Sequence, residues 1–130
     1  MNKSLEFHDS TVSMVRAVGI DLIVSFSDAY VHHSLGEPGV SPGEGFVQPA
    51  ELVFSVALWT GVLGNAVGTI SRGRISLDGQ PLSLLPLPFT TASAVTAQLI
   101  FVSGTVLEVS AASAMCRATG TACFVERFPG

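Results

Sequence analysis

Residues 95–110 read VTAQLIFVSGTVLEVS, and their pattern is the clearest indication of the fold class in the chain. Apolar and polar side chains alternate before and after Gly104, a pattern typical of a half-buried β-hairpin. A three-residue loop that ends with Gly104 in a left-handed conformation places Leu99 opposite Leu107. A two-residue loop would place Leu99 opposite Glu108 instead, so burial favours the longer loop. The predicted inward face then carries Val95, Leu99, Phe101, Leu107 and Val109.

Short runs of β-branched and aromatic residues, separated by Gly, Pro or Asp-Gly, make up most of the remaining chain. This spacing is typical of an all-β fold, and no stretch shows convincing helical periodicity. We therefore predict one domain over residues 1–130, either an antiparallel β-sandwich or a small β-barrel of about eight strands. Besides the hairpin, the predicted strands cover residues 11–18, 21–27, 29–34, 51–59, 74–77 and 122–128.

Two predicted segments are apolar on both faces, whereas residues 21–27 alternate cleanly with Leu22, Val24 and Phe26 on one face. In residues 51–59 the expected inward set is Leu52, Phe54, Val56 and Leu58. The second faces carry Val53, Ala57 and Trp59 in that strand, and Ile100, Val102 and Val106 in the hairpin. Between the strands, residues 36–45 hold four glycines and two prolines and predict a ten-residue loop.

The composition excludes several classes of protein. The chain has 130 residues, of which 48% are apolar and 12% are charged. A disordered chain needs low hydrophobicity and high charge, which is the reverse of this composition. The net charge of -4 and the single lysine, Lys3, argue against nucleic-acid binding, which depends on clustered basic residues.

The sequence predicts a cytoplasmic location without membrane insertion. No apolar run of signal-peptide length follows the positive charge of Lys3. Residues 52–71 and 79–107 carry no charge and are long enough to span a bilayer. Glycine and proline interrupt both stretches, and neither has a basic cluster at its ends, so buried strands are the better interpretation.

The two cysteines are expected to be free thiols, because cytoplasmic proteins rarely keep disulfides. Cys116 and Cys123 flank Thr119-Gly120. A two-residue turn there would bring them opposite one another, so a disulfide between them stays geometrically open.

The histidines give the chain its one candidate metal cluster, His8, His32 and His33 together with Asp9. Adjacent residues of a regular strand point to opposite faces, so His32 and His33 cannot share an ion, nor can His8 and Asp9. At most two ligands would remain, and a catalytic zinc usually has three. We therefore expect no metal and no cofactor. Neither a nucleophile elbow nor a phosphate-binding loop is present, so enzyme activity is not expected.

The opening Phe7-His8-Asp9-Ser10, followed by alternating Val12 and Met14, resembles the start of small bacterial β-proteins, some of which are classed as toxin-immunity proteins. The hairpin residues 101–107 and the closing residues 124–126 are similar to later parts of such chains. The resemblance covers about a quarter of the chain and implies binding of a protein partner. The residues themselves also allow a structural role, in which Asp9 or Ser10 bonds a local backbone amide.

Two functions fit these observations. The first is an interaction module that self-associates, most simply as a homodimer, or binds another protein, since apolar second faces with an aromatic anchor are typical of an interface core. We expect Trp59 or Ile100 near the contact. The alternative is a β-barrel that binds a small apolar ligand, inside the barrel or beneath residues 36–45. The candidate ligand or interface residues are Trp59, Val53, Ile100, Val102, His8, Asp9 and His32.

Overall fold

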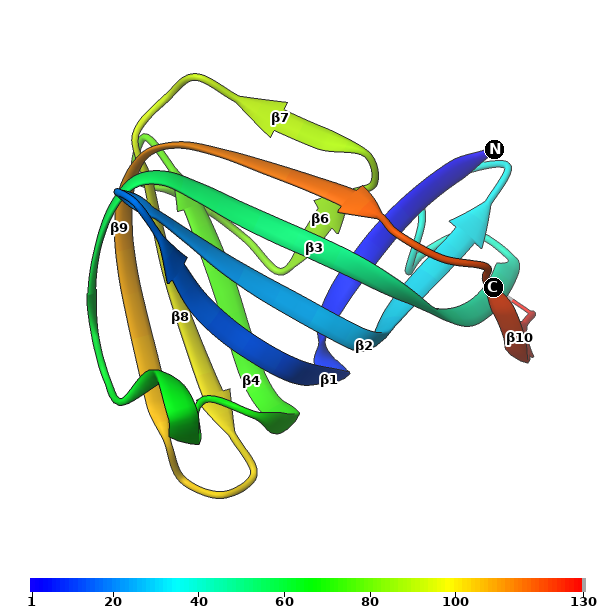
Figure 1. The fold of residues 1–130 in the computed structure, drawn as a ribbon. Helices are drawn as coiled ribbons and strands as arrows, with labels where there is room; N and C mark the ends of the chain where they lie inside the picture. The colour runs from blue at the N-terminus through cyan, green and yellow to red at the C-terminus, as the bar shows by residue number, and fades with distance from the viewer. Residues whose placement is uncertain (130) are drawn as a thin grey trace.

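The computed structural model describes residues 1–129, which form ten β-strands and one short 3-10 turn (Figure 1). No α-helix occurs in this range, and within it no helical segment is long and apolar enough to cross a membrane. Seven strands are long or of medium length, and β5, β6 and β7 have three residues each. The bounds are β1 Asn2–Val18, β2 Asp21–Ser34, β3 Gly43–Thr60, β4 Gly68–Leu77, β5 Gln80–Leu82, β6 Leu84–Pro86, β7 Phe89–Thr91, β8 Val95–Phe101, β9 Val106–Ala118 and β10 Cys123–Phe128, with the turn at Leu63–Asn65.

Six antiparallel strands close into a barrel in the order β1, β2, β3, β9, β8, β4 and back to β1. We call these paired segments the barrel. The predicted all-β fold is therefore confirmed, and of the two predicted architectures the chain adopts the closed one. The strand count exceeds eight because the proline-rich residues 80–91 form three short strands, which pair with β4, β1 and β9.

Side chains fill the interior of the barrel. Phe54, Phe101, Leu22 and Leu107 are fully or almost fully buried in one continuous hydrophobic cluster. A barrel of so few strands encloses only enough space for its own side chains. Phe26 of β2 is part of this packed core as well.

The hairpin of β8 and β9 forms as the sequence predicts. Leu99 lies opposite Leu107, and Gly104 adopts a φ of 94°. The Phe101 amide donates to the carbonyl of Thr105 across the three-residue loop, at 2.9 Å. The five residues of the predicted inward face are all buried. Burial therefore set the register of this hairpin.

The first halves of β1 and β3, and the second half of β2, run beyond the barrel (Figure 1). There β6 pairs with β1, and β10 pairs with β3. We call this five-stranded sheet the extension; it comprises residues 2–8, 29–34 and 43–48 with β6 and β10, and residues 35–42 connect two of its strands. Leu5, Phe7, Val31 and Leu85 of the extension belong to the same hydrophobic cluster as the barrel core.

The strands bend where the barrel meets the extension. The pairing of β1 with β2 shifts between Glu6 and Thr11, and that of β2 with β3 shifts between Phe26 and Ala29. Ser10 is fully buried at this bend, where its hydroxyl donates to the Glu6 carbonyl and accepts from the Tyr30 amide. The serine of the opening motif therefore has a structural role, bridging two strands where their own backbone pairing is interrupted.

Several predicted boundaries differ from the structure, and β4 and β9 also extend beyond the predicted residues 74–77 and 95–110. Residues 21–27 and 29–34, predicted as two strands, form the single strand β2 with an irregularity between them. The first strand starts at Asn2, nine residues earlier than predicted. The glycine-rich loop is shorter than expected, because β3 already begins at Gly43.

The predicted alternation of β3 is wrong after Phe54. Val56 has a φ of 52°, which is rare for a β-branched residue, and this conformation reverses the facing of the residues that follow. Ala57 is consequently buried, whereas Val56 and Leu58 are exposed. The Asp21 carboxylate accepts the Val56 amide and the Ile20 carbonyl accepts the Ala57 amide, so the turn after β1 holds this bulge.

The cysteines are free, as expected, and the turn proposed between them does not form. Cys116 is buried in β9 opposite Leu52, and Cys123 is exposed in β10 opposite Val47. Because β10 continues along the same edge of β3 as β9, the two cysteines pair with different positions of β3 rather than with each other.

Candidate functional site

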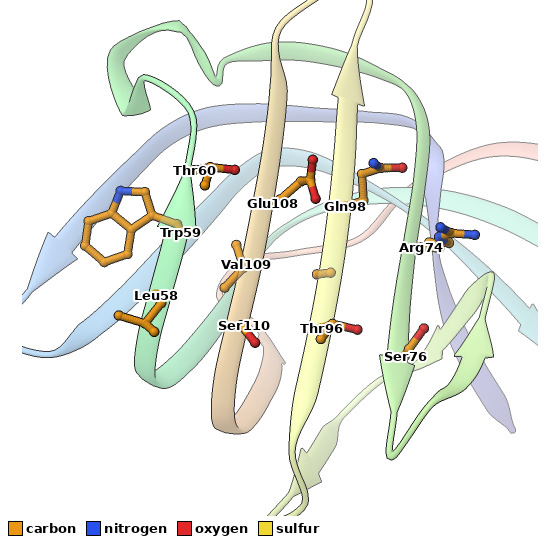
Figure 2. Close-up of a pocket in the computed structure, with 11 residues that line it drawn as sticks. Leu58, Trp59, Thr60, Arg74, Ser76, Thr96, Gln98, Glu108, Val109 and Ser110 are labelled. Atoms are coloured by element: carbon orange, nitrogen blue, oxygen red, sulfur yellow. The ribbon is translucent and has the colours of Figure 1, made fainter.

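A groove crosses the outside of the barrel over β3, β9, β8 and β4, with a volume of about 410 Å³ (Figure 2). One row of polar side chains spans the four strands in register: Thr60, Glu108, Gln98 and Arg74. Leu58 and Trp59 lie at the β3 side, with Arg74 on the opposite side (Figure 2). Leu58 is 76% exposed, whereas Trp59 is half-buried against the core. The groove therefore combines an apolar wall with charged and amide groups.

The four apolar residues selected from the sequence do not form one continuous face. Val53 is half-buried between Ile23 and Met115, whereas Ile100 lies between Arg72 and Val106 in another part of the barrel wall. Val102, 70% exposed, follows Ile100 in the turn between β8 and β9. Trp59 lines the groove.

Strand β10 forms an exposed edge of the extension. It pairs with β3 on one side, and the described residues place no strand on its other side. Phe124 and Val125 are 56% and 46% exposed. Its two charged residues are engaged within the chain: Glu126 accepts from Tyr30, and Arg127 lies 3.7 Å from a carboxylate oxygen of Glu44.

Aromatic and polar side chains pack on the face of the extension opposite Leu5 and Val31. The Tyr30 hydroxyl donates to Glu126, and the rings of Tyr30 and Phe128 both contact His32, with centroids 5.3 and 5.2 Å away. Burial raises the pKa of Tyr30, and the bond to Glu126 raises it further. The Tyr30 hydroxyl therefore stays protonated and remains the donor of the hydrogen bond to Glu126.

His33 lies on the other face, as the strand alternation predicts. Its ring stacks on Phe46 with centroids 4.0 Å apart. Burial lowers the pKa of His33, and the positive charge of Lys3 lowers it further, whereas Glu44 acts in the opposite direction. The net shift favours the neutral imidazole.

The expectation that His8 and Asp9 point apart is wrong. Asp9 has a φ of 69°, in the left-handed region, so strand alternation breaks at this residue. The His8 Nδ1 atom lies 3.4 Å from Asp9 Oδ2, and Glu6 joins them in one group whose ligand atoms all lie within 4.8 Å of each other.

His32 approaches the same group from β2. Its Nε2 lies 3.6 Å from Glu6 Oε2, and neither of its ring nitrogens has a hydrogen-bond partner among the described residues. His32 also lines two hollows. One, of about 630 Å³, is lined by residues that include Glu6, His8 and Arg72, and the other, of about 300 Å³, includes Val40 and Phe128.

Sequence reasoning selected His8, Asp9 and His32 but missed Glu6, Tyr30 and the β10 edge. Glu6 and His8 are two residues apart, and strand residues at this spacing share a face. This spacing could therefore have identified Glu6 as a neighbour of His8. No local signal places Tyr30 beside Glu126, because these residues are 96 positions apart.

Comparison with known proteins adds no relative: no protein-family model, curated protein or solved structure matches this chain. The resemblance of the opening motif to toxin-immunity proteins therefore stays a prediction.

Proposed function

We propose that this chain is a non-enzymatic interaction module that self-associates as a two-fold dimer through β10. The observation that carries the proposal is the form of this strand: it has six residues, five of them exposed, and one strand neighbour. A strand with a free side presents unpaired N–H and C=O groups that another strand can complete. A second copy completes both edges at once, because a two-fold axis places the same strand on both sides of the contact.

Proteins usually protect such edges by keeping them short or by adding proline and free charges. The edge at β6 follows this rule, since it has three residues and ends at Pro86. The β10 edge is less protected, because it is twice as long and Glu126 is bonded to Tyr30, which leaves the largely exposed Arg127, 3.7 Å from Glu44, as its other charge. Low overall charge supports the same conclusion, with 6 basic and 10 acidic residues in 130.

The groove beside Trp59 is the other candidate contact, and it contains the residue expected from the sequence. We favour β10 because backbone pairing and exposed apolar side chains coincide there, whereas every barrel strand below the groove already has two neighbours.

Light scattering on matched variants tests the proposal. The wild-type mass should be twice the chain mass of 13.5 kDa at micromolar concentration. Val125→Lys should give a monomer, because it places a charge in the dimer contact. Val62→Lys, at a residue 64% exposed outside the strands, should remain dimeric, as should Leu58→Lys in the groove. A wild-type mass of 13.5 kDa that does not change on concentration contradicts the proposal. Dissociation by Leu58→Lys alone moves the contact to the groove.

The low reactivity of the buried thiol supports the proposal that the protein is not an enzyme. Cys116 is the buried one, and burial raises its pKa to about 12, so it stays protonated and is a poor nucleophile. Two free thiols also suit the cytoplasm, which is the location that we propose.

Binding of a small apolar ligand is the second candidate function. It is favoured by the hollow of about 300 Å³ beneath residues 39–41, which Val40, Phe128 and Pro129 line in part. Native mass spectrometry of the purified protein tests it: a retained small molecule, lost in Val40→Lys, supports this function, and bare chain mass contradicts it.

A further inference from the structure

We propose that Glu6, His8, Asp9 and His32 form a binding site for a divalent transition-metal ion of the zinc type. The site is independent of the dimer contact proposed above. Three of its residues come from the start of β1, and the fourth comes from β2, which lies beside it.

The spacing of the ligand atoms fits such an ion. Zinc binds histidine nitrogen and carboxylate oxygen at about 2.0–2.2 Å, so two ligands of a tetrahedral site lie about 3.4 Å apart. His8 Nδ1 and Asp9 Oδ2 are 3.4 Å apart, and His32 Nε2 and Glu6 Oε2 are 3.6 Å apart. The Glu6, His8 and Asp9 atoms all lie within 4.8 Å of one another. His32 lies outside this group of three and is linked to it through Glu6, so binding of one ion by all four residues requires the exposed side chains of His8 and Asp9 to rotate toward His32.

The buried histidine supplies independent support. His32 is 9% exposed, and both of its ring nitrogens lack a hydrogen-bond partner among residues 1–129. A buried polar group without a partner is costly. At 3.6 Å the Glu6 carboxylate is too distant for a hydrogen bond but well placed to share an ion with the imidazole. Coordination would therefore satisfy a ring nitrogen that the protein itself leaves unbonded.

The chemistry of the four side chains selects the ion. Two imidazoles favour zinc, nickel, copper or iron over magnesium and calcium, which prefer oxygen ligands. The two carboxylates carry two negative charges, which balance a divalent cation. His8 and Asp9 are exposed, and Glu6, His8 and His32 line the hollow of about 630 Å³, so the ion has a path from solvent.

Calorimetric titration of chelator-treated protein with zinc alone tests this site. We expect one ion per chain, with binding weakened about tenfold or more in His8→Asn and in Asp9→Asn. Asparagine tolerates the left-handed conformation of residue 9, so Asp9→Asn removes the charge while keeping the backbone. Asp28→Asn is the matched control, since Asp28 is also an exposed acid at the bend but lies outside the group.

A second readout keeps the test valid for any variant of altered stability. Zinc should raise the melting temperature of the wild type and of Asp28→Asn, but not that of the His8→Asn/Asp9→Asn double variant. Circular dichroism without zinc checks that each variant is folded. The proposal is overturned by absence of saturable zinc binding to the wild type, or by equal affinity in the wild type and the double variant.

Discussion

The barrel and the extension share three strands but differ in how their backbone and polar groups are satisfied. In the barrel, each strand pairs with a neighbour on both sides. In the extension, the described residues leave β6 and β10 with one neighbour each. Within residues 1–129, the four buried side-chain polar atoms that lack partners also belong to the extension: His32 Nδ1 and Nε2, His33 Nε2 and Gln48 Oε1.

This difference suggests that the barrel stabilises the fold and that the extension carries the binding surfaces. A fully paired and packed barrel stabilises the fold and offers little for a partner to bind, whereas open edges and unsatisfied groups can be completed by a ligand or a second chain. Regions that bind are also commonly less stable than the core that supports them. We therefore expect substitutions in the barrel to reduce stability, and those in the extension to alter binding.

The largest effect is expected in the barrel core. Phe101→Ala should lower the free energy of unfolding by about 3–5 kcal/mol, because it removes a buried ring and leaves a cavity. Chemical denaturation measures this loss. The neighbouring Val102→Ala, at an exposed position, should stay within about 0.5 kcal/mol of the wild type. A loss below about 1 kcal/mol for Phe101→Ala would show that its side chain does not face the core.

A smaller loss is expected at the bend between the two regions. Ser10→Ala removes the hydroxyl that bonds Glu6 and Tyr30, leaving buried backbone groups without partners. The expected cost is about 1–3 kcal/mol by the same measurement. Ser27→Ala, at an exposed serine of the same bend, serves as the control and should be almost neutral. Equal effects of the two variants would mean that Ser10 does not bridge the strands.

The extension should also make stability depend on pH through His33. Its pKa is lower in the folded state than its ordinary value of 6.5, so the unfolded chain binds more protons near that pH. The free energy of unfolding should therefore fall as the pH drops through 6.5 toward the lower folded-state pKa. Denaturation on both sides of pH 6.5 measures the slope, which His33→Leu should reduce. An unchanged slope in that variant would assign the dependence to other groups.

The mildest probe compares one thiol from each region. Cys123, exposed in the extension, should react with a thiol reagent in the native protein, whereas Cys116, fully buried in the barrel, should react only after unfolding. Counting labels before and after adding denaturant distinguishes them. Rapid reaction of both thiols in the native state would mean that the barrel opens readily.

The parts of the fold that could be predicted are those fixed by neighbouring residues. Gly104 and the alternation around it determine the β8–β9 hairpin, since turn geometry and burial agree there. Val56 and Asp9 could not be predicted in the same way. Both break the alternation with left-handed backbone at a residue other than glycine, and their positions depend on contacts such as that between Val56 and Asp21. Closure through β3 and β9 depends on residues far apart in the chain, which local patterns do not report.

Hydrogen exchange at two protein concentrations locates the dimer contact within the chain. Amides of Cys123–Phe128 should exchange more slowly at the higher concentration, while those of the barrel strands should not change. This result would place the interaction surface on the extension. Exchange in β10 that is independent of concentration, or new protection at residues 58–60 instead, would contradict a dimer formed through β10.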